Sequence, residues 1–163
     1  MKQQKIITSM SICTLDELTE QEQLLVRQAQ KATQRSYSPY SSFQVGAAVL
    51  LDNETIVTGS NQENAAYPSG LCAERTALFY AGSQYPDMPI KALAIAGYTK
   101  GEFLDEPLSP CGACRQVMLE TEIRSKKPMR VYLIGRKKIY ILESASSLVP
   151  LSFKGDVLPQ KND

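Results

Sequence analysis

The sequence contains no histidine, and its charge is almost balanced, with 18 Lys and Arg residues against 17 Asp and Glu residues. Without imidazole, any general base or metal site must be built from other side chains. The small net charge, with no basic stripe, argues against a phosphate backbone as the main ligand, so we expect no nucleic-acid partner. No apolar run is long enough to cross a bilayer, and we expect no membrane association.

Length and composition fit one globular domain. A chain of 163 residues with 43% apolar and 21% charged residues can bury a single core. Polar residues interrupt the few apolar ones in residues 1–14, which is not the pattern of a signal peptide, so we expect a poorly ordered N-terminal arm there. We expect a single domain over residues 15–158 and a cytoplasmic location.

Helical and strand patterns alternate along the chain. A capping box at Thr14 and apolar residues at helical spacing predict a first helix that runs to about Gln34. Further helices are predicted over residues 72–81, with Gly82 as the terminator, over residues 111–124, and briefly after Ser144. Strands are predicted over residues 43–51, 55–59, 92–97, 131–134 and 139–142, with a loop over residues 99–110.

This order of elements predicts an α/β fold with three layers, α/β/α, around a five-stranded mixed sheet. Only the tight turn at residues 135–138 joins the last two strands. A parallel pair needs a crossover of a dozen or more residues, so these two strands must be antiparallel.

Three of the four cysteines lie where helices are predicted to begin. Cys72 precedes one helix, and Cys111 and Cys114 lie one helical turn apart at the start of another. A helix N-terminus lowers the pKa of a thiol and favours the thiolate, which is the form that binds metal. Three thiols with an open fourth position are the pattern of a catalytic zinc site, so we expect one zinc ion per chain.

Other interpretations of these cysteines remain open. Cys111 and Cys114 could form a redox pair, half of a structural zinc site, or part of the core. Cys13 could supply a fourth thiol, although it lies far from the others in the sequence. The combination of Cys72-Ala73-Glu74 with the later Pro-Cys-x-x-Cys motif is more specific than either part and favours catalytic zinc.

The two cysteine motifs resemble those of zinc-dependent nucleoside deaminases, including their all-cysteine variant. The similarity extends over about residues 20–155 and is carried by residues 43–48, 61–67, 72–77 and 109–116. Together these segments resemble the small homotetrameric cytidine deaminases of the cytidine/deoxycytidylate deaminase superfamily. The N-terminal arm and a longer loop at residues 100–108 depart from the family pattern.

The resemblance implies hydrolytic deamination of free cytidine and deoxycytidine to uridine and deoxyuridine, a reaction of pyrimidine salvage. Zinc would lower the pKa of a bound water, whose hydroxide attacks the ring carbon that carries the amine. Glu74 would be the catalytic proton shuttle, although alone it could be a first-turn glutamate favoured by the helix dipole. Arg75 would offset the charge of three thiolates, or else form a surface salt bridge.

The resemblance also implies the contacts with the substrate, which is a small nucleoside. Phe43 would stack on the base, and Asn61 and Glu63 would bind the ribose 3′-hydroxyl, a group that both donates and accepts. The other two substrate contacts on the same subunit are Tyr67 and Ala73.

Phe153 belongs to the run at residues 148–153, which resembles the C-terminal segment of this family. The family's Phe reaches into the site of a neighbouring subunit, so the resemblance implies a homotetramer with sites shared between chains. Alternatively, Phe153 covers the core of its own chain.

Three rival functions were considered. A blasticidin-type deaminase shares the zinc motif, but the complete Asn-x-Glu-Asn run at residues 61–64 favours a nucleoside. Deaminases of tRNA or single-stranded DNA usually have His-x-Glu and a helix between the last two strands, for which the turn at residues 135–138 leaves no room. The third rival is a non-catalytic zinc-binding module, and the presence of Glu74 counts against it.

Overall fold

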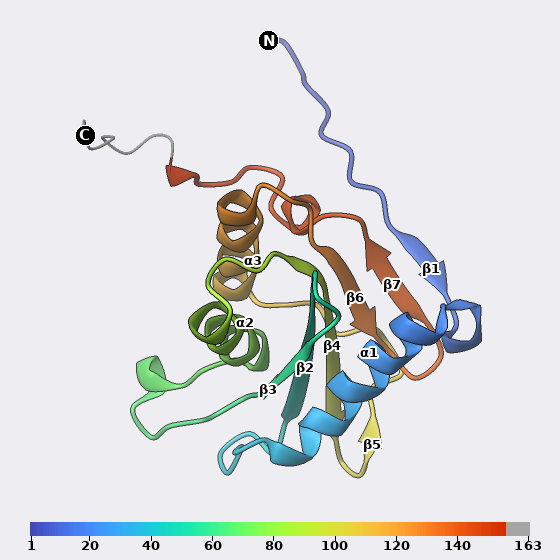
Figure 1. The fold of residues 1–163 in the computed structure, drawn as a ribbon, viewed down its shortest axis with the longest axis vertical. Helices are drawn as coiled ribbons and strands as arrows, with labels where there is room; N and C mark the ends of the chain where they lie inside the picture. Colours follow the sequence, from blue (N-terminus) through green and yellow to red (C-terminus); the bar gives the residue numbers. More distant parts are fainter. Residues whose placement is uncertain (156–163) are drawn as a thin grey trace.

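The chain folds into three layers, with a mixed β-sheet between one helix on one face and two on the other (Figure 1). The structure is a computed structural model and describes residues 1–155. The α-helices are α1 (Glu20–Ala32), α2 (Ala73–Gln84) and α3 (Gly112–Ser125), and the 3-10 helices are η1 (Leu15–Glu17), η2 (Thr33–Arg35), η3 (Tyr67–Ser69) and η4 (Ala145–Leu148). None of the helices in this described part is both long and apolar enough to cross a bilayer.

The sheet has seven strands in the order β1-β7-β6-β4-β2-β3, and β5 pairs with β4. The strands are β1 (Ser11–Cys13), β2 (Gln44–Leu51), β3 (Ile56–Ser60), β4 (Ile90–Thr99), β5 (Glu102–Phe103), β6 (Arg130–Ile134) and β7 (Ile139–Leu142). β4 and β6 are parallel, and β6 and β7 are antiparallel, as the short turn between them predicted. The prediction of five strands was wrong, because β1 and β5 are only three and two residues long and carry too short a pattern to detect.

The expectation of a poorly ordered arm over residues 1–14 does not hold for the C-terminal part of that segment, residues 11–13. Ser11–Cys13 form β1 and pair antiparallel with β7, and Cys13 packs against the buried residues under α1. The unpaired edge of β7 offers main-chain donors and acceptors that a three-residue strand can satisfy. At the other end, residues 156–158 of the predicted domain lie outside the described residues.

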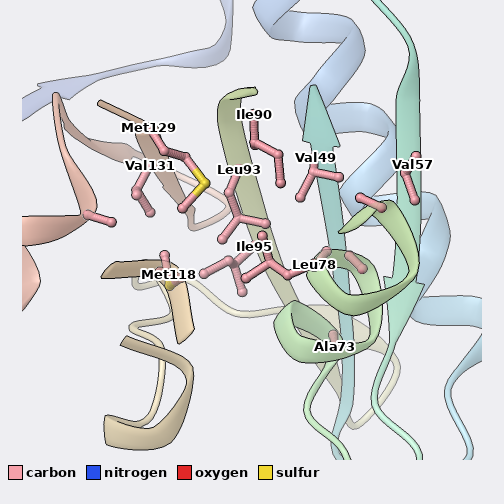
Figure 2. Packing of buried hydrophobic residues seen from close by; sticks show 14 of the residues in the cluster. Val49, Val57, Ala73, Leu78, Ile90, Leu93, Ile95, Met118, Met129 and Val131 are labelled. Carbon is pink, nitrogen blue, oxygen red and sulfur yellow. The ribbon is translucent and has the colours of Figure 1, made fainter. Parts of the chain in front are cut away.

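Two apolar layers cover the sheet. Leu93 and Ile95 of β4 pack beneath α2 and α3 together with Met118 (Figure 2). The alternate residues of β4, which include Ala94 and Ala96, face α1. This alternation follows from the two-residue period of a strand, and each large buried side chain contributes about 1.5–3 kcal/mol.

Two glycines on neighbouring strands let α1 and α2 approach opposite faces of the sheet. A Cβ atom at Gly46 would lie 2.1 Å from the carbonyl oxygen of Ala29 in α1. A Cβ atom at Gly59 would lie 2.5 Å from the main-chain nitrogen of Ala77 in α2. Any larger residue at Gly59 would push α2 away from β3, so this glycine sets where the N-terminus of α2 lies.

The prediction that Gly82 ends the second helix was wrong, because α2 continues to Gln84. Gly82 lies against α3, where a Cβ atom would be 3.1 Å from Nη2 of Arg124. Gly82 therefore lies inside the helix, near the flexible end of a side chain from α3, and does not terminate α2.

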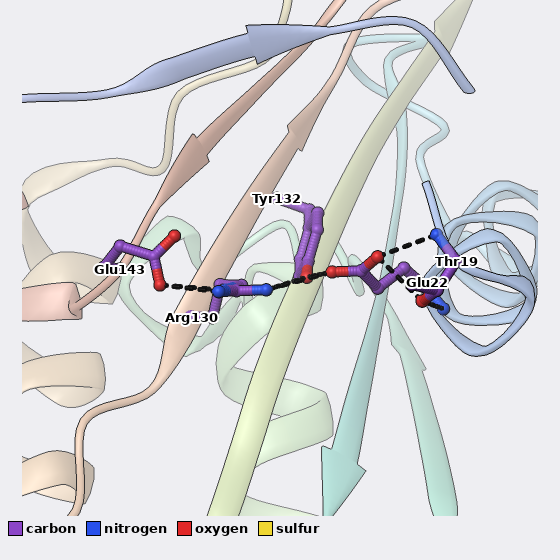
Figure 3. Close-up of polar contacts among 5 residues, drawn as sticks. All are labelled: Thr19, Glu22, Arg130, Tyr132 and Glu143. Atoms are coloured by element: carbon purple, nitrogen blue, oxygen red, sulfur yellow. Dashed lines mark hydrogen bonds and ion pairs between the residues drawn. The ribbon is translucent and has the colours of Figure 1, made fainter. Parts of the chain in front are cut away.

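A polar network ties the start of α1 to the middle of the sheet (Figure 3). One carboxylate oxygen of Glu22 accepts from the main-chain N–H of Thr19 at 2.9 Å, which closes a capping box. The other oxygen accepts from Arg130 at 3.0 Å and from the hydroxyl of Tyr132. Burial alone would raise the pKa of Glu22, but the hydrogen bonds from Tyr132 and Thr19 and the charge of Arg130 together lower it.

Candidate metal centre and active site

Three thiols meet where α2 and α3 begin. Cys72 is the N-cap of α2, Cys111 is the N-cap of α3, and Cys114 lies in the first turn of α3. Their three Sγ atoms all lie within 4.8 Å of one another, and those of Cys72 and Cys111 are 3.8 Å apart. Among residues 1–155, Cys13 is not part of this cluster, so the four-thiol alternative is not supported.

The chemistry of the donor set fits zinc. The hydrogen bond with Cys114 lowers the pKa of Cys72 to about 5, and Arg75 adds to this against the opposing effect of burial. The same hydrogen bond and burial raise the pKa of Cys114, so a metal must displace that proton. Three sulfur ligands at two helix N-termini suit one zinc ion and would leave a fourth coordination position free for water.

Arg75 lies beside the cluster. Its Nη2 is 3.8 Å from Sγ of Cys72 and 3.5 Å from the carbonyl oxygen of Gly70. Its Nε is buried and has no hydrogen-bond partner among the described residues. The hydrogen bond to Cys72 raises the pKa of Arg75, which keeps a fixed positive charge next to the thiolates.

Glu74 is the second residue of α2 and is only 4% exposed. Burial raises its pKa, and the negative charge of Cys72 raises it further. A carboxyl group with a raised pKa binds a proton more readily than an ordinary carboxylate, as a general base must. Ala73, just before it, is fully buried, and its main-chain N–H lies in the first helical turn, where it has no intrahelical partner.

A cavity of about 500 Å³ opens beside Cys72. Its walls include three of the predicted substrate contacts, Asn61, Glu63 and Tyr67, together with Arg75. Tyr67 is 78% exposed and packs edge-on against Tyr40, with ring centroids 6.3 Å apart. The structure thus places a cavity with several polar side chains in its walls directly against Cys72 of the thiol cluster.

Asn61 connects the cavity to the start of β2. Its Oδ1 accepts from the main-chain N–H of Val45 at 2.8 Å and from the hydroxyl of Ser36 at 2.5 Å. Its Nδ2 donates to the carbonyl oxygen of Phe43 at 2.9 Å, which leaves one amide hydrogen for a ligand. Phe43 itself is half-buried and does not line this cavity.

Glu63 holds a loop that sequence reasoning missed. Its carboxylate accepts from the main-chain N–H groups of Tyr40 at 2.9 Å and Ser41 at 3.3 Å, and from the hydroxyl of Ser41. The Ser41 hydrogen bond lowers the pKa of Glu63, so the group is ionised at neutral pH. Tyr40 and Ser41 both line the cavity, although no motif in the sequence singles them out.

Phe153 lies apart from the other predicted site residues in this chain. Its side chain is 59% exposed and does not line the cavity. Its carbonyl oxygen accepts from Nε2 of Gln116 in α3 at 3.1 Å. The C-terminal segment is therefore held along the helix that carries two of the thiols, with the aromatic ring exposed.

The layered fold and the thiol cluster define a metal-binding α/β protein with a buried carboxyl group beside the metal position. Residues 19–127 match the family described as the cytidine and deoxycytidylate deaminase zinc-binding region, and the chain belongs to this family. The zinc in that description agrees with the three-thiol donor set at residues 72, 111 and 114.

Relatives of known name cover most of the chain. A cytidine deaminase of Sporosarcina psychrophila is 42% identical over 82% of this chain and 92% of its own length. A cytidine deaminase of Halalkalibacterium halodurans is 47% identical over 60% of this chain and 70% of its own length. The crystal structure of the cytidine deaminase from Burkholderia pseudomallei is similar with a TM-score of 0.70 and 38% identity, over 83% of this chain and all of that one.

Proposed function

We propose that this chain catalyses the zinc-dependent hydrolysis of free cytidine and deoxycytidine to uridine and deoxyuridine, with release of ammonia. The observation that carries this proposal is the buried Glu74 beside a three-thiol cluster that opens on a cavity. The relatives named as cytidine deaminases support it. The reaction would serve pyrimidine salvage in the cytoplasm, where reducing conditions keep the thiols free for metal.

Cys72, Cys111 and Cys114 would hold the zinc, which when bound supplies a Lewis acid that makes water a nucleophile near neutral pH. The oxygen of the water bonds to the ring carbon that carries the amine while Glu74 takes a proton from that water. Glu74 then delivers this proton to the adjacent ring nitrogen. Glu74 then moves the proton of the new hydroxyl group to the amine, which leaves as ammonia while the carbonyl forms. Its raised pKa suits a group that must hold a proton between these transfers.

The charges around the cavity favour a nucleoside over a nucleotide such as deoxycytidylate. Among the lining residues within the described range 1–155, Arg75 is the single cation, and it is already engaged with Cys72. Glu63 adds a negative charge to the same wall. A 5′-phosphate carries up to two negative charges and would find no free cation there.

We assign the remaining substrate contacts as follows. The free amide hydrogen of Asn61 and the carboxylate of Glu63 bind the ribose 3′-hydroxyl, and Phe43 stacks on the base. The free N–H at Ala73 binds the base, and Tyr67 forms the outer wall. Phe153, exposed in its own chain, completes the site of a neighbouring subunit in a homotetramer.

The test is ammonia release from cytidine by zinc-loaded wild type and by Glu74→Gln. The variant should keep one zinc per chain and its fold but lose about 10²–10⁴-fold in turnover, because only the proton carrier is changed. Glu120→Gln, on the exposed side of α3, is the matched control and should behave as wild type. Turnover by Glu74→Gln within tenfold of wild type would remove Glu74 from the mechanism.

A further inference from the structure

The segment between β4 and α3 delivers Cys111 to the thiol cluster and contains residues 100–108, the loop that the sequence resemblance implies to be longer than in the family. It begins with a short hairpin in which Tyr98 pairs with Phe103 and Thr99 pairs with Glu102. Its later part crosses the ends of β4 and β6 before α3 starts at Gly112. The position of Cys111 therefore depends on what holds this loop.

Main-chain contacts fasten the loop to two strand ends. The N–H of Leu104 donates to the carbonyl of Gly97 at 3.1 Å, and the N–H of Arg136 donates to the carbonyl of Leu104 at 2.7 Å. A Cβ atom at Gly135 would lie 2.5 Å from the carbonyl oxygen of Asp105. The loop thus lies in backbone contact with the turn between β6 and β7.

Ion pairs join the same two segments. Arg136 contacts Asp105 through Nη2 at 2.5 Å and Nε at 2.7 Å, and Glu102 through Nη1 at 2.6 Å. The two lysines of the turn add pairs of 2.9 Å (Lys137 with Asp105) and 2.8 Å (Lys138 with Glu106). Isolated surface pairs contribute little, but a network centred on a two-pronged arginine is the arrangement in which such pairs matter.

The link from the network to the metal position is short and stiff. Only residues 107–110 separate Glu106 from Cys111, and two of them, Pro107 and Pro110, have a fixed φ. Pro110 is buried, and its carbonyl accepts from Nε of Arg115 in α3 at 2.9 Å. A displacement of Asp105 would therefore also displace Cys111, because the segment between them has little conformational freedom to compensate.

We propose that the acidic segment at residues 102–106 and the basic turn at residues 136–138 form an ion-pair clamp that positions Cys111 as a zinc ligand. Arg136 is the central positioning residue of this clamp and acts on the metal only through the loop. The inference rests on the proposed zinc site. By holding Cys111 in place, the ion-pair clamp would slow the release of zinc from the protein.

The test measures how fast zinc-loaded protein releases zinc to an excess of a chromogenic chelator. Arg136→Met keeps the aliphatic stem and removes the charge, and should release zinc roughly threefold to tenfold faster, less than the 10–100-fold cost of losing a group that touches a ligand directly. Arg136→Lys keeps the charge and should recover part of the effect. Lys91→Met breaks a comparably exposed pair with Glu54 at the opposite end of β4 from the loop, and should match wild type.

Salt provides a second measurement that needs no variant. Raising ionic strength screens exposed ion pairs, so zinc release from wild type should accelerate with salt, while Arg136→Met should respond much less. Equal release rates for Arg136→Met and Lys91→Met, or a wild-type rate that is indifferent to salt, would overturn the clamp. Zinc release needs no substrate, so a wild type that binds zinc and fails to deaminate cytidine would contradict the proposed function and leave the test of the clamp intact.

Discussion

At the scale of single residues, Glu63 has two possible tasks that substitution can separate. Its carboxylate already accepts three hydrogen bonds from Tyr40 and Ser41, so it shapes the wall of the cavity. An ionised carboxylate offers about four acceptor positions, which leaves room for a ribose hydroxyl. The first task affects every substrate equally, whereas the second affects only those with a 3′-hydroxyl.

We expect Glu63→Ala to narrow the difference in kcat/KM between cytidine and 3′-deoxycytidine. A hydrogen bond to a charged group contributes about 1.5–3 kcal/mol, so wild type should prefer cytidine by roughly tenfold to a hundredfold and the variant much less. Ser41→Ala removes the hydroxyl contact, one of the three from the loop, and keeps the carboxylate, so it should slow both substrates without changing their ratio. An unchanged ratio in Glu63→Ala would mean that Glu63 does not contact the ribose.

At the scale of elements, α1 is attached to the sheet by both packing and charge. Leu25, Val26 and Ala29 pack on the sheet, and Gly46 allows close contact of the two backbones. Glu22 adds the polar connection to Arg130 and Tyr132 of β6 (Figure 3). Because the folded protein lowers the pKa of Glu22, this connection stabilises the fold only where the carboxylate is charged.

We expect Glu22→Gln to lower the free energy of unfolding by about 1–2 kcal/mol at pH 7, since Gln can keep the capping box but loses the charge. The contribution is fully present above the unfolded pKa of about 4.3 and is lost as pH falls through the lower folded value. The gap between wild type and variant, measured by urea unfolding, should therefore shrink below about pH 4. Glu143 also contacts Arg130, but its side chain is 70% exposed, so Glu143→Gln should change the free energy of unfolding little. A difference between wild type and Glu22→Gln that does not depend on pH would contradict the role assigned to Glu22.

At the scale of the whole molecule, Phe153 is one of several large apolar residues that a single chain leaves exposed. Gln116 holds its main chain against α3, while its ring is 59% exposed. Closed symmetric oligomers commonly place parts of a binding pocket at subunit interfaces. A shared site would explain why an apolar ring is held at the surface next to the helix of two metal ligands.

We expect Phe153→Ala and Glu74→Gln each to have low deaminase activity as pure proteins. Activity should return when the two variants are mixed in hybrid tetramers. Some sites in such hybrids would combine an intact Glu74 with an intact Phe153 from the adjacent chain. Hybrid formation would be verified by mass before ammonia release is measured. Activity equal to the sum of the two pure variants would show that Phe153 serves its own chain.

The sequence alone determined what depends on short-range geometry. The spacing of Cys111 and Cys114 places two thiols one helical turn apart, and the four-residue turn before Ile139 requires an antiparallel pair, as observed. The order of helices and strands likewise predicted the three layers, because each pattern has its own period. Cys72 was grouped with the other two thiols from its place at a second helix start, and the resemblance to the deaminases supported this grouping.

Only the tertiary structure decided what depends on contacts between distant segments. β1 and β5 are too short to show a pattern and exist because β7 and β4 offer them an edge. Gly82 lies inside α2, which continues to Gln84, so a glycine that looks locally like a helix terminator is not one here. The pairing of residues 102–106 with residues 136–138 joins charges about 30 residues apart, and in the sequence each group looks like an ordinary solvated loop. Chain folding brings them together, because β4 and β6 are adjacent parallel strands whose ends carry the loop and the turn.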